Sequence, residues 1–135
     1  MTIQKLMTEV IISMRWKSIL RKNKFMNRKT YNKLIRDKIP EIIKKNGAIP
    51  KVSVLDEEKF KVALKEKLVE EASELLEAKT NEEVLNELSD VLQLLESIAQ
   101  NNNTTIAEVE KQKEKKKQER GAFEKKLFLE YVDDP

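Results

Sequence analysis

The 135-residue sequence contains no cysteine and no histidine. Without cysteine there are no disulfides and no thiol nucleophiles, and without histidine there is no imidazole to act as a base. Zinc sites built on these two residue types are excluded as well. An enzyme with this composition must therefore work with carboxylates, amines, guanidinium groups and metal ions.

Glycine, proline and aromatic residues are also scarce, with 2 Gly, 3 Pro and 5% aromatic residues. This composition argues against a β-sandwich and favours helices. No apolar run approaches the ~20 residues that a membrane span needs, and the first 25 residues lack the apolar core of a signal peptide. We therefore expect a cytoplasmic protein with no membrane segment, and the absence of cysteine fits a reducing compartment.

Charged residues make up 38% of the chain, but the two signs are distributed unevenly. Residues 1–55 contain 14 basic and 3 acidic side chains, whereas residues 56–110 contain 5 basic and 15 acidic ones. Such an acidic segment repels a phosphate backbone unless cations intervene. We therefore expect no nucleic-acid partner.

Capping residues and hydrophobic spacing predict a mainly α-helical chain. Four helices are expected: residues 40–45, between Pro40 and Gly47; residues 56–79, after the N-cap Asp56; residues 80–100, opened by the capping box of Thr80 with Glu83; and residues 105–120, opened by Thr105 with Glu108 and ended by Gly121. The composition of residues 51–55 and 126–132 adds a small two-stranded β element to this prediction.

The first 25 residues are basic, and apolar side chains recur at helical spacing between residues 3 and 20. This pattern predicts a basic amphipathic extension in front of a single domain that covers residues 26–135. Three roles stay open for the extension: a helix on a membrane surface, a helix docked on the domain, or a dispensable segment that precedes a start at Met26.

Two pairs of carboxylates lean toward the apolar seams of consecutive helices: Glu71 with Glu74, and Glu87 with Asp90. A spacing of three residues puts each pair on one helix face, and a short loop between antiparallel helices turns the pairs toward each other. Buried carboxylates are costly unless they are paired or bind a cation. Oxygen ligands alone favour Mg²⁺ or Mn²⁺. The alternative is that these are ordinary glutamates of an acidic segment.

The same residues carry a resemblance to a known family. The chain has the motif Glu70-Glu71-x-x-Glu74 followed by Glu87-x-x-Asp90. It resembles the signature of the all-alpha nucleoside triphosphate pyrophosphohydrolase (MazG) superfamily. Residues 32–43 and 120–125 resemble the ends of its small house-cleaning, phosphoribosyl-ATP-pyrophosphohydrolase-like branch, although Ala122 stands where a second glycine is expected. The resemblance covers about residues 30–132 and implies an antiparallel helical bundle that forms a homodimer or homotetramer.

The resemblance also implies a reaction and a set of ligands. Mg²⁺, which Mn²⁺ can replace, is expected on Glu71, Glu74, Glu87 and Asp90. The expected reaction is hydrolysis of a noncanonical or excess nucleoside triphosphate to its monophosphate and pyrophosphate. The candidate catalytic residues are Glu70, which would orient or deprotonate the water, and Lys67, which would stabilise the departing pyrophosphate. The candidate phosphate or ribose ligands are Arg36, Lys38, Lys116 and Arg120, for which solvated or structural roles are the alternative.

Two other functions stay open. One is a phosphoribosyl-ATP pyrophosphohydrolase of histidine synthesis, although the sequence Lys-Leu-Ile-Arg-Asp-Lys-Ile-Pro at residues 33–40 favours the house-cleaning branch. The other is a catalytically idle helical module that binds a partner or nucleic acid through residues 1–25. The intact set of four acidic ligands favours an enzyme over such a module.

Overall fold

The computed structural model describes residues 3–7 and 27–135 of the chain. Residues 3–7 are helical, and four further helices follow: α2 (Ile39–Lys45), α3 (Glu57–Glu77), α4 (Asn81–Asn101) and α5 (Ile106–Arg120). The prediction of a mainly α-helical chain is confirmed, and the ends of these four helices lie within two residues of the expected ones. Most of the helix expected over residues 3–20 lies outside the described residues.

Side-chain caps explain where the longer helices begin. The Asp56 carboxylate accepts a hydrogen bond from the Lys59 backbone N–H at 2.9 Å. At the start of α4, the Thr80 hydroxyl accepts from the Glu83 N–H at 3.1 Å, and the Glu83 carboxylate accepts from the Thr80 N–H at 3.4 Å. The Thr105 hydroxyl caps α5 through the hydrogen bond that it accepts from the Glu108 N–H, at 3.2 Å. Each cap satisfies a backbone donor that the helix itself cannot.

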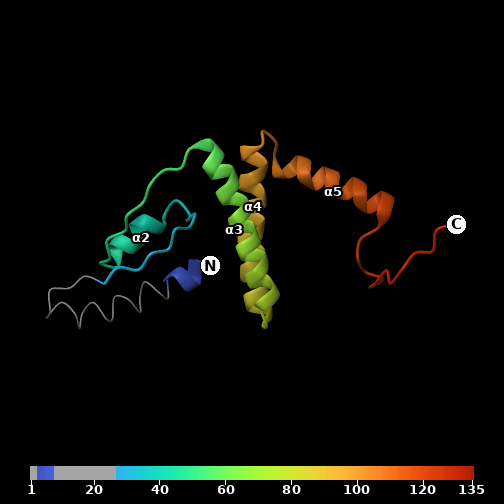
Figure 1. Ribbon diagram of the computed structural model, residues 1–135, viewed down its shortest axis with the longest axis horizontal. Helices are drawn as coiled ribbons and strands as arrows, with labels where there is room; N and C mark the ends of the chain where they lie inside the picture. The colour runs from blue at the N-terminus through green and yellow to red at the C-terminus, as the bar shows by residue number, and fades with distance from the viewer. Residues whose placement is uncertain (1–2, 8–26) are drawn as a thin grey trace.

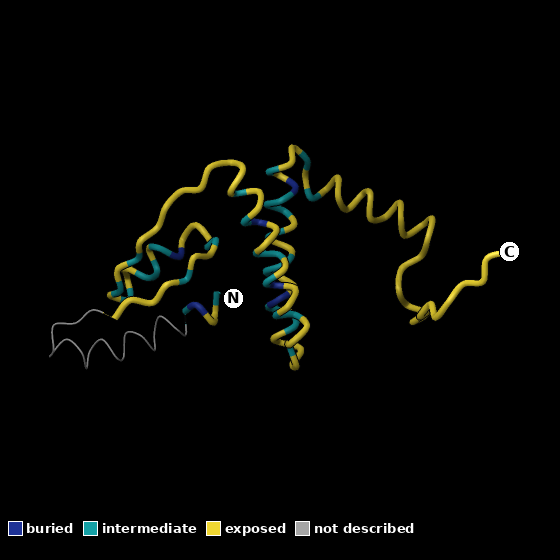
Figure 2. Tube along the Cα trace, viewed as in Figure 1, coloured by how far each residue is buried: buried dark blue, intermediate teal, exposed yellow. Residues whose placement is uncertain are grey.

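Helices α3 and α4 form an antiparallel hairpin joined by residues 78–80 (Figure 1). Helix α2 and the helical segment 3–7 lie on one side of this hairpin. Helix α5 leaves the far end of α4 and points away on the opposite side, followed by the carboxyl-terminal tail. Buried residues gather on the hairpin and on the segments beside it, whereas α5 beyond its first residue and the tail are exposed (Figure 2).

The core within the described residues is small and partly acidic. Its buried apolar side chains are those of Leu6, Ile39, Leu64 and Ala99. Two glutamates, Glu71 and Glu87, are buried to a similar extent, with exposed fractions of 2% and 7%. One member of each acidic pair predicted from the sequence is therefore part of the buried core.

The two-stranded β element expected from residues 51–55 and 126–132 is not formed, since the described residues contain no strand. A strand is stable only when another strand supplies its hydrogen bonds. The first segment runs toward α3 on the side of α2, whereas the second lies in the tail beyond α5, on the opposite side of the hairpin (Figure 1). All residues of both segments are exposed, so the two have no common surface on which to pair.

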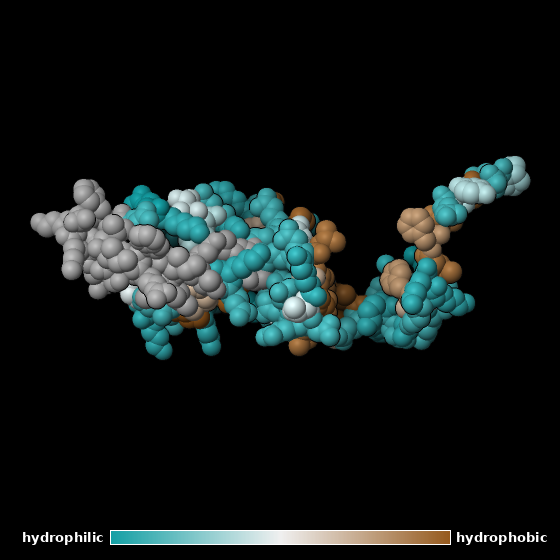
Figure 3. All heavy atoms as spheres, turned by 90° about the horizontal axis from the view of Figure 1, so that it is seen from below, coloured by the Kyte–Doolittle hydropathy of each residue, from teal (hydrophilic) through white to brown (hydrophobic). Residues whose placement is uncertain are grey.

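Several large apolar side chains on the hairpin remain exposed. They lie at helical spacing on both helices: Val62, Val69 and Leu76 on α3, and Leu85, Leu88, Leu92 and Leu95 on α4. Apolar atoms gather on the hairpin side turned toward α5 and on the tail (Figure 3). None of the helices in the described part of the chain combines the length and the apolar character needed to cross a lipid bilayer.

Candidate functional site

Three of the predicted carboxylates converge between α3 and α4. Glu71 and Glu74 from α3 and Glu87 from α4 each place one carboxylate oxygen within 4.8 Å of the others. We call these three residues the acidic triad. The hairpin explains their meeting, because Glu71 lies seven residues before Ala78 and Glu87 lies seven residues after Thr80. Equal distances from the turn put the two side chains at the same level of the antiparallel pair, about two helical turns from the loop.

Two oxygen atoms of the triad lack any partner. Oε2 of Glu71 and Oε2 of Glu87 are buried and accept no hydrogen bond within the described residues. Leaving a buried polar group unsatisfied costs about 1–3 kcal/mol, and more when the group is charged. A divalent cation between the triad residues would supply the missing partner, because carboxylate oxygens are the ligands that Mg²⁺, Ca²⁺ and Mn²⁺ prefer. The residues present thus fit a metal ion, and their oxygens alone do not distinguish among these three metals.

The electrostatics of the triad show how strongly the carboxylates repel one another. Burial, a hydrogen bond with Glu71 and the negative charges of Glu74, Glu71 and Asp90 together raise the pKa of the Glu87 carboxyl to about 7, and burial contributes most. The protonated carboxyl of Glu87 donates the hydrogen bond to Glu71. Without a cation, the triad therefore binds a proton near neutral pH.

Asp90, the fourth predicted metal ligand, lies next to the triad and is paired with a cation of the chain. Its Oδ1 accepts a hydrogen bond from Nη2 of Arg36 at 2.8 Å. Asp90 is displaced from the triad along the helix axes because the two helices run in opposite directions. From Glu71 to Glu74 the chain of α3 runs toward the turn, whereas from Glu87 to Asp90 the chain of α4 runs away from it. Each step of three residues covers about 4.5 Å along a helix, so Glu74 and Asp90 lie on opposite sides of the Glu71–Glu87 level.

Basic side chains surround the acidic residues. The Nζ atom of Lys67 is 3.5 Å from Oε1 of Glu71 and 3.8 Å from Oε2 of Glu70. Lys33 donates to Oε1 of Glu70 at 3.0 Å, and the Nζ atom of Lys5 is 3.8 Å from Oε1 of Glu74. The structure thus brings the predicted Glu70 and Lys67 to the site, with Glu70 held between two lysines. Sequence reasoning missed Lys33, although it belongs to the same motif as Arg36.

A pocket adjoins the triad on the side of the hairpin that carries α2. The charged side chains of its wall are those of Lys33, Arg36, Lys67, Glu71 and Asp90. Apolar side chains from residues 3–6, 31–39 and α4 line the rest. Tyr31 and Gln93 also belong to the wall, and neither stood out in the sequence because each lies outside the acidic motif.

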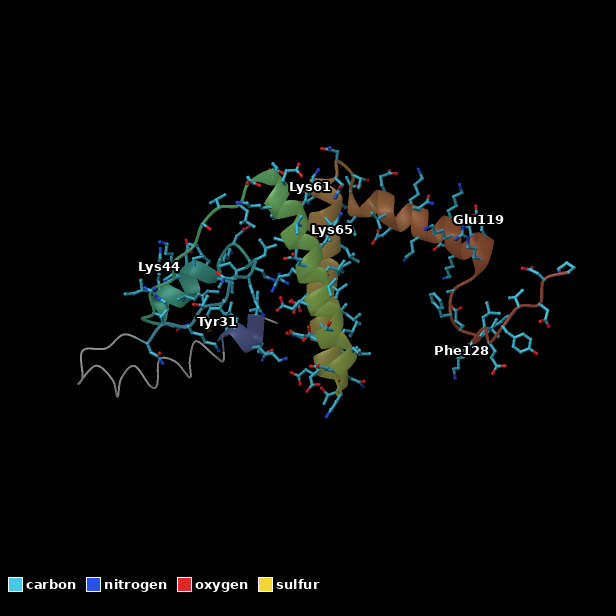
Figure 4. The ribbon with its side chains drawn as sticks, viewed as in Figure 1. Tyr31, Lys44, Lys61, Lys65, Glu119 and Phe128 are labelled. Atoms are coloured by element: carbon cyan, nitrogen blue, oxygen red, sulfur yellow. The ribbon has the colours of Figure 1, made fainter. Side chains whose placement is uncertain are left out.

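The three other predicted ligands lie away from the pocket. Lys38 is the exposed N-cap residue of α2 and is not part of the pocket wall. Lys116 and Arg120 lie on α5, which has no buried residue and points away from the hairpin. In Figure 4, Tyr31 lies beside the hairpin on the side of α2, whereas Glu119, the neighbour of Arg120, lies on the distant arm.

Comparison with known proteins adds no relative. A scan against models of protein families, a search of curated proteins and a search of solved structures each found no match.

Proposed function

We propose that the protein is a Mg²⁺-dependent nucleoside triphosphate pyrophosphohydrolase of the all-alpha (MazG) superfamily. The observation that carries this proposal is the acidic triad, with its buried and unpartnered oxygens on Glu71 and Glu87. A pocket bordered by Arg36 and Lys67 opens beside it. Carboxylates that hold a metal and cations that hold phosphate are the two elements that hydrolysis of a phosphoanhydride requires.

The proposed reaction cleaves the bond between the α- and β-phosphates. A water oxygen forms a bond to the α-phosphorus, the bond to the bridging oxygen breaks, and pyrophosphate leaves with that oxygen. When bound, a divalent cation neutralises phosphate charge and lowers the pKa of water. Glu71, Glu74 and Glu87 would hold it, and Asp90 would join them once Arg36 leaves its carboxylate.

The remaining residues of the site act on phosphate and water. Arg36 and Lys67, now paired with Asp90 and Glu71, would exchange these carboxylates for oxygens of the triphosphate. Their positive charges then stabilise the negative charge that develops on the departing pyrophosphate. Glu70 would orient the water or accept its proton, which requires that it move away from Lys33 and Lys67.

We further propose a house-cleaning role on noncanonical or excess nucleotides, which the protein would carry out in the cytoplasm, where nucleotides are made and used. A second copy of the chain is the proposed partner, because it would cover the apolar residues that α3 and α4 leave exposed. Within one chain α5 points away from the hairpin, so Lys116 and Arg120 could act as phosphate ligands only from α5 of a neighbouring copy in such an assembly.

The experiment that tests the function is a measurement of pyrophosphate release. The substrates are canonical and noncanonical nucleoside triphosphates together with phosphoribosyl-ATP, each with Mg²⁺ or with EDTA. We expect Mg²⁺-dependent release of equal amounts of monophosphate and pyrophosphate from at least one nucleoside triphosphate. Activity on phosphoribosyl-ATP alone would move the protein to histidine synthesis, and the absence of hydrolysis with every substrate would refute the proposal.

A further inference from the structure

The pocket beside the acidic triad has the composition of a site for a largely apolar group. Its walls include Leu6, Leu34, Ile39 and Leu94, with the aromatic ring of Tyr31 among them. These residues come from the helical segment 3–7, from the extended chain before α2, from α2 itself and from α4. Mostly apolar walls with a few polar groups are typical of pockets that bind small organic ligands.

The pocket and the triad share side chains. Glu71 is a member of the triad and also lines the pocket. Asp90, which lies about one turn after Glu87 on α4, lines the pocket as well. Arg36 and Lys67, the proposed phosphate ligands, also line the pocket, where Arg36 is paired with Asp90 and Lys67 with Glu71. A molecule whose phosphates lie beside these four side chains therefore has the apolar part of the pocket as the space for its remaining atoms.

We propose that this apolar part is the subsite for the nucleobase of the substrate, an inference that rests on the proposed function. A base has two apolar faces, which aromatic and aliphatic side chains cover, and a polar edge, which needs hydrogen-bonding partners. Gln93 supplies such a partner. Its side-chain amide offers both a donor and an acceptor, and the residue is exposed at the pocket wall.

The helical segment 3–7 is part of this subsite. Ile3 and Leu6 line the pocket, and Leu6 is only 8% exposed. The ammonium group of Lys5 lies 3.8 Å from a carboxylate oxygen of Glu74, so the segment also touches the triad. Of the three roles that the sequence left open for the basic extension, the contacts of residues 3–7 support docking on the domain. These residues then help to select the substrate.

The test compares ligands with and without a base. The probes are α,β-methylene analogues of the adenine, guanine, cytosine and uracil nucleoside triphosphates, which cannot be cleaved at the bond in question, and inorganic tripolyphosphate. Their affinities are measured by calorimetry with Mg²⁺ present, for the full chain and for Q93A and L6A. Q100A is the matched control for Q93A, since Gln100 is an exposed glutamine of α4 outside the pocket. L64A is the control for L6A, since Leu64 is buried away from the pocket.

We expect at least one nucleotide analogue to bind at least about tenfold more tightly than tripolyphosphate, the gain that contacts to one base typically supply. Q93A and L6A should remove most of this preference while the affinity for tripolyphosphate stays the same, and both controls should keep the preference. Equal affinities for all probes, or equal losses for tripolyphosphate and nucleotides in Q93A, would overturn the base subsite and leave the proposed function standing. If Mg²⁺ promotes the binding of no probe, the proposed function itself is wrong and the subsite fails with it.

Discussion

Glu71 and Glu87 are two of only six buried side chains in the described residues, beside Leu6, Ile39, Leu64 and Ala99. Replacing such carboxylates by apolar groups of similar volume is often neutral or stabilising, so their presence in a small core works against stability. Strain and unsatisfied groups of this kind gather where function requires them. The loss of stability arises at the triad itself, and a bound cation would remove it.

The raised pKa of Glu87 gives a pH dependence of defined sign. In the folded chain Glu87 holds its proton up to about pH 7, whereas in the unfolded chain it loses the proton near 4.5. Stability therefore falls as pH rises between these two values and is level above them. The sequence has no histidine, so no imidazole titrates in the same interval.

In EDTA we expect the melting temperature to be several degrees higher at pH 5.5 than at pH 7.5. The variant E87Q should reduce this difference and raise the melting temperature at pH 7.5, because the amide carries no charge and can still donate a hydrogen bond to Glu71. A melting temperature that rises with pH in EDTA would contradict this account of the triad.

The charge of the triad is also expected to be essential for activity. E71Q and E87Q keep the side-chain volume and remove the charge that holds the cation. We expect each to lower kcat/KM by about 100-fold or more, the scale of loss when an electrostatic group is removed from a catalytic site. E82Q is the matched control, because Glu82 is an exposed glutamate in the first turn of α4. Full activity in either triad variant would refute the assignment.

At the residue scale, the sequence predicts which carboxylates face inward because helical periodicity reports the direction of each side chain. It does not predict the partner of Asp90. Arg36 lies 54 residues earlier in the chain, in an extended segment whose position depends on the folded packing. The same limit applies to Lys33, whose contact with Glu70 joins residues 37 positions apart.

At the scale of elements, the turn between α3 and α4 sets the register of the triad. The capping box of Thr80 with Glu83 fixes the first turn of α4, and the Glu83 carboxylate also accepts from the Lys79 N–H at 2.7 Å. These backbone hydrogen bonds lower the pKa of Glu83. Insertion or deletion of one residue at this turn would rotate Glu87 by about 100° around the axis of α4 and move its side chain away from Glu71 and Glu74.

Loss of this cap should weaken both the fold and the metal site. We expect T80A to lower the free energy of unfolding by about 1 kcal/mol, as is typical for an N-cap. We also expect T80A to raise the Kd for Mg²⁺, because the first turn of α4, and with it the position of Glu87, is then less well fixed. T105A removes the equivalent cap from α5, which holds no triad residue, and serves as the control. Urea unfolding and calorimetry measure the two effects, and equal Mg²⁺ affinities in T80A and T105A would contradict the role of the turn.

At the scale of the whole molecule, the helices and the antiparallel pairing of α3 with α4 could be predicted from the sequence, whereas the positions of α5 and the tail could not. Caps and breakers such as Asp56, Thr80 and Gly121 act within a few residues, and the helix ends followed from them. The expected pairing of residues 51–55 with 126–132 failed because it depended on where α5 leads the chain. The distance of Lys116 and Arg120 from the triad has the same cause.

The exposed apolar side chains of the hairpin make the oligomeric state testable. V69K places a charge on this surface, at a position that is 67% exposed in the single chain. We expect the V69K variant to form a smaller assembly than the wild-type protein, because burial of a charge in an apolar interface is costly. Light scattering measures the two masses. V54K is the control, since Val54 is fully exposed but lies outside the hairpin. A wild-type protein that is an active monomer at micromolar concentration would contradict the proposed homodimer or homotetramer.

The central claim is that Glu71, Glu74 and Glu87 hold a divalent cation, and calorimetric titration of the metal-free protein with Mn²⁺ at pH 7.5 tests it most directly. The account predicts saturable binding to the wild-type chain, a Kd at least about tenfold higher in E87Q, and an unchanged Kd in the control E82Q. The absence of binding at millimolar Mn²⁺, or equal affinities in all three proteins, would contradict it.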